Sequence, residues 1–264
     1  MKKIISVVIV LFLAIVAQCH EFWLLPKKFK YAVGEEVKID FLVGENFDDE
    51  SWDLKKNKIE KLELHHLANT TSIKEQVKPD ERDKLKIKFN EVGTYLLSMQ
   101  SDNAYIEMDA EKFNNYLKDE GIEDILSLRE KTNSLSKSSR ENYSRCAKLL
   151  IQSGDKIDDT FKKKVGLKLE IIPQQNPYTL HSGDYLQCLI LFDGKPVPHQ
   201  LVKVWNKIGL NTFLQNAYTE NDGTIKFPIN SKGPWMVSTV KMIASTQLTA
   251  DWQSYWGSLI FGIE

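Results

Sequence analysis

Apolar and polar residues alternate along much of the chain between residues 31 and 101. Val37, Ile39 and Phe41 occupy every second position, and the same spacing recurs in the later segment KLKIKFNEVGTYLLSMQS. A period of two places the apolar side chains on one face of a β-strand. Turn residues separate these short strands, with no helical pattern between them. We therefore predict an antiparallel β-sandwich over residues 20–108.

The period changes in the middle of the chain. Two segments carry apolar residues three and four positions apart, which is typical of amphipathic helices. These residues are Phe113, Tyr116 and Leu117 in the first segment and Tyr143, Ala147 and Leu150 in the second. Gly121 interrupts the first segment, and the polar stretch KTNSLSKSS joins the two. The spacing predicts an α-helical hairpin over residues 109–154, inserted between two β regions.

Strand patterns return over residues 165–264. The segments are GLKLEIIP, DYLQCLILFDG, LVKVWNKI, TIKFPI and PWMVSTVKMI. DGKPVPHQLVKV and YTENDGTIKFPI resemble the strands and turns of carboxypeptidase-regulatory and transthyretin-like β-sandwiches. The expected fold is therefore mainly β, with two antiparallel β-sandwich domains (Ig/transthyretin-like) and the helical hairpin between them. Sandwiches of this kind serve many functions, so the fold does not identify the activity.

The N-terminus has the pattern of an export signal. Lys2 and Lys3 precede a largely apolar run from Ile4 to Val16, and small residues follow. The run has 13 residues, fewer than the roughly 20 that a membrane-spanning helix needs. We predict a signal peptide over residues 1–19 and export to the periplasm or cell envelope. A retained membrane anchor is the alternative.

Charge and motif content exclude several function classes. The 35 Lys and Arg residues nearly balance the 36 Asp and Glu residues, which argues against nucleic acid or an anionic membrane surface as a partner. Nucleophile-elbow, phosphate-loop and HExxH motifs are absent from the sequence, so we do not expect an enzyme. Cys146 and Cys188 either pair as a disulfide or remain buried thiols, and their spacing leaves both open.

Several motifs occur in the order seen in a known family. They are HEFWLLP, GENF, RENYSRCAKLL, LEIIPQQNPYTLHSGDYL, GKPVPHQLVKV, DGTIKFPI and DWQSYWGSLIF. With these motifs the whole mature chain resembles the DUF4198 family. The resemblance implies a periplasmic component of cobalt or nickel uptake, related to NikM-type nickel transport proteins. It also implies a metal-uptake transporter or an outer-membrane receptor as the partner.

His20 is the first candidate metal ligand, and its chemistry depends on how the signal is processed. Cleavage after Cys19 leaves His20 as the first residue, whose α-amine and imidazole Nδ1 chelate one metal ion together. A further imidazole would complete a histidine brace suited to Cu(II), Cu(I) or Ni(II). Cleavage after Ala17 places His20 third, where amine, amide nitrogens and imidazole form a square-planar site. Lipidation of Cys19 blocks the amine and tethers the protein to a membrane. The family resemblance favours the first outcome.

Other candidate ligands are weaker. Glu21 is a second potential metal ligand because it follows His20 directly. The remaining histidines, His65, His66, His181 and His199, lack the spacing of a metal site, and we expect each to be a surface or half-buried residue. His65 and His66 are adjacent on a predicted strand, so their rings point to opposite faces. The family pattern has a histidine where this chain has Lys241, and a protonated lysine cannot ligate a metal.

Large aromatic residues gather near both ends of the mature chain. They are Phe22, Trp23, Trp252, Tyr255 and Trp256. An exposed set would suit ligand stacking, but aromatics more often pack in a core, so we expect packing and expect the chain ends to meet. The leading function is a metal-binding accessory protein for Ni, Co or Cu uptake that uses His20. The alternative is an envelope lipoprotein or interaction module, such as a receptor accessory or glycan binder, without metal.

Overall fold

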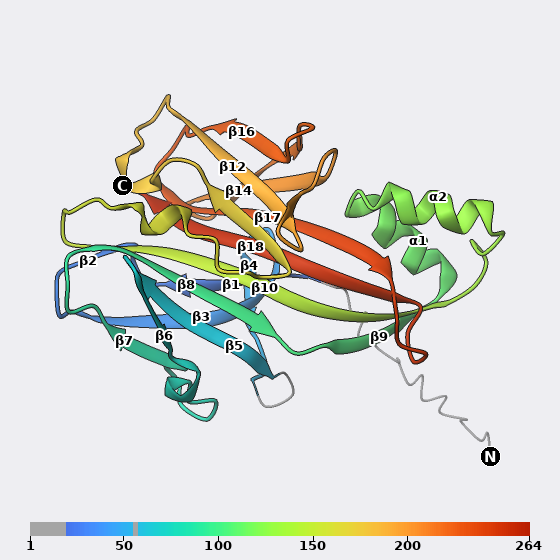
Figure 1. Cartoon of the computed structure of the whole chain (residues 1–264), viewed down its shortest axis with the longest axis horizontal. Helices are drawn as coiled ribbons and strands as arrows, with labels where there is room; N and C mark the ends of the chain where they lie inside the picture. Colours follow the sequence, from blue (N-terminus) through green and yellow to red (C-terminus); the bar gives the residue numbers. More distant parts are fainter. Residues whose placement is uncertain (1–19, 55–57) are drawn as a thin grey trace, which may run out of the picture.

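A long central sheet organises the molecule. The computed structural model describes residues 20–54 and 58–264 and is mainly β (Figure 1). The central sheet runs in the order β15 (Asn211–Tyr218), β14 (Leu201–Ile208), β17 (Gly233–Ala244), β18 (Trp252–Ile263), β10 (Ser139–Ser153), β8 (Gly93–Ser101), β5 (Ile59–His66) and β6 (Asn69–Ser72). The strands β2 (Lys30–Tyr31) and β9 (Ala104–Met108) also pair with β10.

Two smaller sheets accompany the central one. The N-terminal sheet contains β1 (Glu21–Pro26), β3 (Glu36–Glu45), β4 (Asp48–Ser51) and β7 (Leu85–Lys88). The C-terminal sheet contains β11 (Leu169–Pro173), β12 (Tyr185–Phe192), β13 (Lys195–Pro196) and β16 (Thr224–Pro228). Short 3₁₀ helices lie at Lys74–Gln76, Asp159–Lys162 and Pro177–Thr179.

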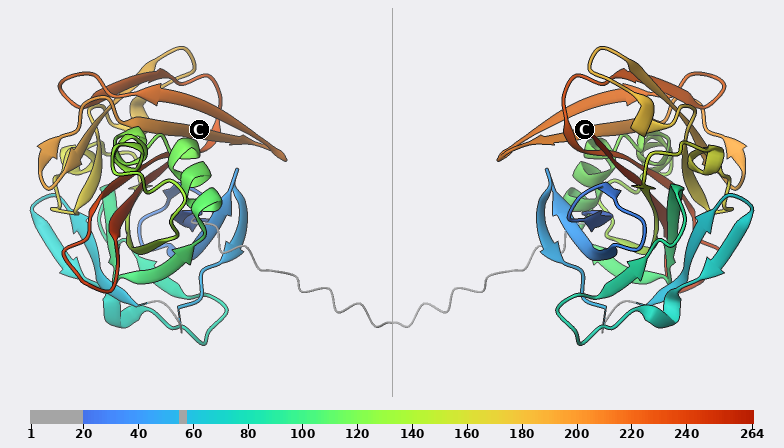
Figure 2. Two further views of the ribbon diagram at one scale, coloured as in Figure 1. Left: turned by 90° about the vertical axis from the view of Figure 1, so that its right-hand side faces the viewer. Right: turned by 90° about the vertical axis from the view of Figure 1, so that its left-hand side faces the viewer.

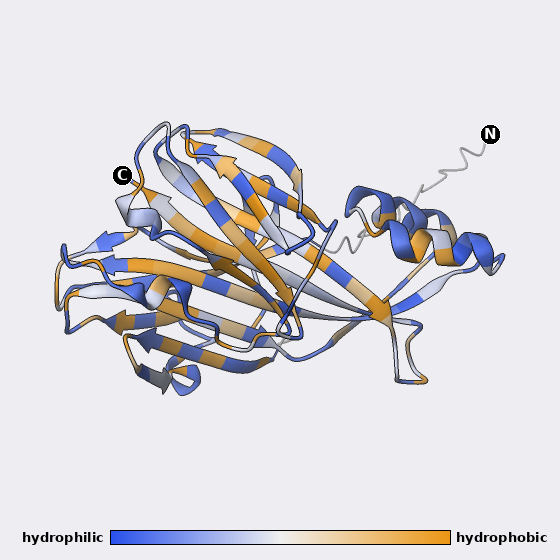
Figure 3. Cartoon of the chain, turned by 45° about the horizontal axis from the view of Figure 1, so that its top comes forward, coloured by the Kyte–Doolittle hydropathy of each residue, from blue (hydrophilic) through white to orange (hydrophobic). Residues whose placement is uncertain are grey.

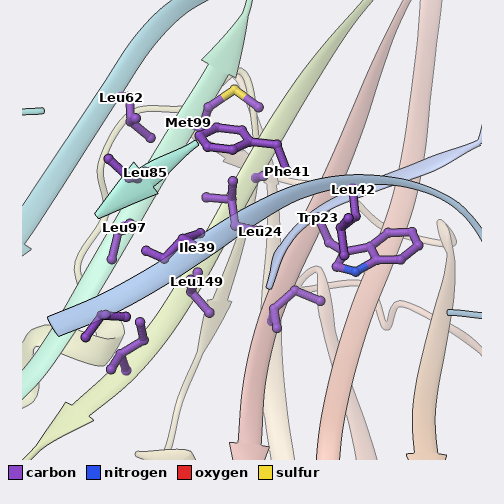
Figure 4. Close-up of a cluster of buried hydrophobic side chains, with 14 of the residues drawn as sticks. Trp23, Leu24, Ile39, Phe41, Leu42, Leu62, Leu85, Leu97, Met99 and Leu149 are labelled. Carbon is purple, nitrogen blue, oxygen red and sulfur yellow. The ribbon is translucent and has the colours of Figure 1, made fainter. Parts of the chain in front are cut away.

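The smaller sheets pack on opposite faces of the central sheet. Leu149 belongs to the apolar cluster formed with the N-terminal sheet, whereas its neighbour Leu150 belongs to the cluster formed with the C-terminal sheet. Successive side chains of a strand point to opposite faces, so this alternation places one core on each side. Figure 4 shows part of the first core, with Trp23 and Phe41 beside side chains from the central sheet. Hydrophobic and hydrophilic residues alternate along many strands (Figure 3).

The helices cover one end of the central sheet. Helices α1 (Ala110–Asp119) and α2 (Glu123–Lys131) lie at the end of the molecule opposite the C-terminus (Figures 1 and 2). Asp109 caps α1 by accepting a hydrogen bond from the backbone N–H of Lys112. The apolar faces of the helices form a third core with Trp256 and other residues of β17 and β18. No helix among residues 20–54 and 58–264 is long and apolar enough to cross a membrane.

The predicted helical hairpin is half correct. Residues 110–131 are helical, with the predicted break at Gly121, where φ is +64°. The second predicted helix is wrong, because Ser139–Ser153 is the strand β10. Both faces of β10 are covered, so almost all of its side chains are buried and apolar residues occur without alternation. An apolar run of this kind is compatible with a helix or with a doubly covered strand, and spacing alone does not separate them.

The central sheet crosses the predicted domain boundaries. Its strands come from the predicted N-terminal sandwich, from the predicted insert and from the predicted C-terminal sandwich. The pairing of β10 with β18 is parallel, as is the pairing with β2, whereas the other ladders are antiparallel. The short strand β2, near the start of the described chain, and the last strand, β18, therefore both pair with β10. The predicted signal peptide and Cys19 lie outside the described residues.

Candidate metal-binding site at the start of the first strand

His20 lies at the rim of an open pocket beside the turn between β3 and β4. β1 pairs with β3 so that Glu21 faces Gly44, which brings His20 next to Glu45. The Nδ1 atom of His20 is 3.4 Å from Oε1 of Glu45. The pocket has a volume of about 470 Å³. Its lining residues are His20, Val43, Gly44, Glu45, Asn46, Asp48 and Glu50.

The GENF motif builds the turn of this pocket. Asn46 and Phe47 join β3 to β4 with φ angles of +56° and +54°, as in the two-residue type I′ hairpin. Asparagine adopts this conformation readily, whereas phenylalanine does so at a cost of about 1–2 kcal/mol. Phe47 is buried edge-to-face against Trp23, with ring centroids 5.6 Å apart. Burial of the ring offsets the backbone cost and fixes the position of Glu45.

The imidazole and the carboxylate have the separation of two metal ligands. Ligands about 2.1 Å from a tetrahedral metal ion are about 3.4 Å apart, which matches the distance between His20 and Glu45. Nδ1 of His20 is also buried without a hydrogen-bond partner among residues 20–54 and 58–264. The described chain contains no group of three or more histidine, cysteine or acidic residues arranged for a metal. The side chains therefore supply two donors, and a complete site needs others.

Glu21 does not face this pocket. Its side chain is only 5% exposed, and Oε1 is 3.6 Å from Nζ of Lys203 on β14. Lys203 also contacts Glu120, at the end of α1, with an N–O distance of 2.7 Å. Burial raises the pKa of Glu21 to about 7, although Lys203 opposes this shift. Glu21 thus belongs to a buried charge cluster with Lys203 and Glu120, on the other side of β1 from the His20 pocket.

The three charges in this cluster influence one another. Burial raises the pKa of Glu120, and Glu45 raises the pKa values of both Glu120 and Glu21 further. Burial also lowers the pKa of Lys203, but the two carboxylates outweigh this effect, and the net shift is upward. Lys203 therefore remains charged and neutralises only part of the acidic charge. Lys203 and Glu120 are 83 positions apart in the sequence, so no local sequence pattern predicted this cluster.

Glu21→Gln is expected to raise the free energy of unfolding by less than about 1 kcal/mol at pH 5 and by about 1–3 kcal/mol at pH 8. The folded-state pKa of Glu21, about 7, lies above the ordinary value of 4.5. The folded protein therefore binds more protons between these values, and its stability falls as the pH rises through them. Glutamine mimics the protonated carboxyl at every pH. Urea unfolding at both pH values measures the effect.

The control for this prediction is Glu220→Gln, because Glu220 is exposed. This variant should change stability equally little at pH 5 and pH 8. An equal effect of Glu21→Gln at the two pH values would show that Glu21 does not titrate between them in the folded protein.

The other histidines do not join the His20 pocket. His65 and His66 are buried in the central sheet, so the prediction that each is a surface or half-buried residue is wrong for these two. His65 bonds to Thr70 and Ser98, and its pKa is lowered to about 4 by burial. His66 stacks on Tyr95, which lies on the opposite face from Ser98, so the predicted divergence of the two rings is confirmed. His181 and His199 are exposed.

Lys241 forms an ion pair rather than taking part in a ligand group. Its Nζ atom is 3.1 Å from Asp124 on α2. Cys146 and Cys188 are free, buried thiols in the core beneath the C-terminal sheet. Burial raises the pKa of Cys146 to about 11, so this thiol is a poor metal ligand near neutral pH.

The aromatic residues at the chain ends pack as expected. Phe22, Trp23 and Trp256 are buried. The ring of Trp256 stacks on Tyr116 of α1, and the ring of Trp252 stacks on Phe113, with centroids 6.0 and 6.3 Å apart. These contacts pack helix α1 against β18.

Comparisons with known proteins agree with the sequence motifs. The family model described as a domain of unknown function, DUF4198, matches residues 17–242. The matched range contains His20, the GENF turn, Lys203 and most strands of all three sheets. No curated protein matches the chain. Since the family model covers most of its length, the chain belongs to the DUF4198 family.

Proposed function

We propose that this is an exported accessory protein that binds a transition-metal ion, Ni(II) or Co(II) and also Cu(II), at His20 and Glu45 for delivery to an uptake system. The observation that carries the proposal is Nδ1 of His20, which has no hydrogen-bond partner among the described residues and lies 3.4 Å from a carboxylate oxygen of Glu45 at the rim of an open pocket. The metal ion is cargo rather than a resident cofactor. An open pocket suits a cargo that must leave again.

The donor types suit divalent ions of intermediate hardness. Imidazole nitrogen binds Ni, Co, Cu and Zn well, and carboxylate oxygen favours the divalent forms over Cu(I). Asp48 and Glu50 line the same pocket and add negative charge, which raises the local concentration of cations. The nitrogen that faces Glu45 is Nδ1. This nitrogen is the one that chelates together with the α-amine if export leaves His20 as the first residue.

His20→Ala is expected to weaken Ni(II), Co(II) and Cu(II) binding by at least about 100-fold. Loss of a residue that only hydrogen-bonds to a metal ligand already costs about 10–100-fold in affinity, and loss of the ligand itself should cost more. Glu45→Gln is expected to weaken binding by about 10-fold, because the amide oxygen is a poorer donor than a carboxylate. Isothermal titration of the processed protein with each metal measures both effects.

His181→Ala is the matched control, because the His181 side chain is 88% exposed and its Nδ1 lies 3.6 Å from Asp184. This variant should bind each metal as the wild type does. If His20→Ala binds as tightly as wild type, the metal site lies elsewhere or is absent. An envelope lipoprotein or interaction module without metal then becomes the better account.

The contribution of the α-amine is tested by intact mass and N-terminal sequencing of the exported protein. A chain beginning at His20 should bind Cu(II) and Ni(II) more tightly than the same chain carrying one extra N-terminal residue. A lipid on Cys19 would remove the amine donor. Only the side chains of His20 and Glu45 would then supply donors to the proposed site.

A further inference from the structure

The strand β15 forms an exposed edge of the central sheet. It pairs with β14 over eight consecutive residue pairs without a register shift, and no described strand pairs with its other side. Gly209, with φ of +60°, and Leu210 form the turn, and Leu210 is 100% exposed. Figure 2 shows the orange β14–β15 hairpin extending past the neighbouring strands. One row of backbone N–H and C=O groups along β15 is thus free to pair.

β15 lacks the features that protect sheet edges from pairing. Its sequence, NTFLQNAY, contains no charged residue and no proline. Other edge strands of the described chain are short, charged or proline-containing. β6 has four residues, β4 carries Asp48 and Glu50, β7 carries Lys86 and Lys88, and β16 carries Lys226 and Pro228. Proteins commonly block sheet edges with these features. Their absence from β15 indicates that this edge pairs with another strand.

Both faces of β15 present apolar side chains to a potential partner. Leu214 pairs with Trp205 and lies on the face of the N-terminal sheet, as does Tyr218. Phe213 lies on the opposite face. All three side chains are about half exposed. An added strand would cover them with its own alternating side chains, which is how β-strand addition obtains specificity.

Charges at the two ends of β15 select the occupant. The turn end contacts the His20 pocket, because Thr212 and Lys207 donate hydrogen bonds to the carbonyl oxygens of Asn46 and Phe47, respectively. Acids outnumber lysines near both ends. The turn end has three acids, Glu45, Asp48 and Glu50, and two lysines, Lys207 and Lys232. The far end has two acids, Glu220 and Asp222, and one lysine, Lys195.

We infer that β15 binds an extended segment of another polypeptide, uncharged in its middle and basic at its ends. Antiparallel pairing of two copies of this chain would bring the acidic end of one strand against the acidic end of the other. Like charges across an interface oppose association, so a second copy is the less favourable occupant. The position of the edge next to the His20 pocket places the partner within reach of a bound metal ion, but the inference does not depend on metal.

The test uses a synthetic peptide of alternating valine and threonine with two lysines at each end. Fluorescence anisotropy at low ionic strength should show binding at least about 10-fold tighter than for the same peptide with glutamates at its ends. N-methylation of alternate residues blocks the hydrogen bonds of one peptide edge. Placed on one edge it should abolish binding, and placed on the other edge it should leave binding intact.

A protein variant tests whether the peptide binds at β15. Leu214→Lys adds a positive charge at an exposed position, so the fold should persist while peptide binding falls by at least about 10-fold. His20→Ala should bind the peptide as wild type does, which separates this inference from the proposed metal site. Peptide binding that survives Leu214→Lys, or that tolerates N-methylation of either edge, would overturn the inference. So would a dimer in sedimentation that Leu214→Lys dissociates, because the occupant would then be a second copy.

Discussion

Lys148→Ala is expected to lower the free energy of unfolding by about 3–5 kcal/mol, because it leaves a buried carboxylate without its partner. Lys148 on β10 and Glu170 on β11 are 1% and 3% exposed, with Nζ 2.9 Å from Oε1. Glu170 also accepts hydrogen bonds from the backbone N–H groups of Val165 and Gly166. The pair therefore connects the central sheet to the C-terminal sheet and to the loop before β11.

Lys162→Ala is the matched control for this prediction. Lys162 and Asp159 form an ion pair with a similar distance of 2.8 Å, but their side chains are 51% and 75% exposed. Water screens this pair, so its loss should cost less than about 1 kcal/mol. Urea unfolding of both variants at neutral pH compares the two costs. Equal costs would mean that Glu170 regains water or protonates in Lys148→Ala, and that burial does not determine the contribution of the pair.

Trp23→Ala is expected to lower the free energy of unfolding by about 3–5 kcal/mol through the cavity that it leaves. Trp23 is fully buried in the core between β1 and the central sheet (Figure 4). The indole also supports the ring of Phe47, whose backbone has a positive φ. Without that support the GENF turn should relax, so metal binding at His20 and Glu45 should weaken together with stability.

Trp23→Phe separates the aromatic volume from the polar group of the indole. The Nε1 atom of Trp23 has no hydrogen-bond partner among the described residues, so phenylalanine removes an unsatisfied donor as well as volume. We expect a cost of about 1–2 kcal/mol, well below that of alanine. Leu210→Ala, at a fully exposed position, should change stability by less than about 0.5 kcal/mol. A cost for Trp23→Phe as large as that for Trp23→Ala would contradict this account.

Local alternation was sufficient to predict the strands that have one buried face. In β3, Val37, Ile39 and Phe41 are buried at every second position, as predicted. The helices at residues 110–131 were also predictable, since one face of each packs on the sheet and the other faces solvent. β10 was not predictable in this way, because sheets from distant parts of the chain cover both of its faces.

The candidate site was partly predictable. His20 and the GENF motif were visible in the sequence, but the register of β1 against β3 decides that Glu45, rather than Glu21, lies beside the imidazole. Alternation along β1 turns Glu21 to the other side, where it meets Lys203 and Glu120. These contacts join residues far apart in the chain, which a linear pattern does not record.

Periodicity and motifs are local properties, so they were enough to predict the mainly β composition, the helices at residues 110–131, the family and the candidacy of His20. Three features depend on long-range packing: strands from both halves of the chain form one central sheet, β10 is a strand, and His20 shares a pocket with Glu45. Strand register and layer packing set these outcomes, since they determine which side chains leave water together.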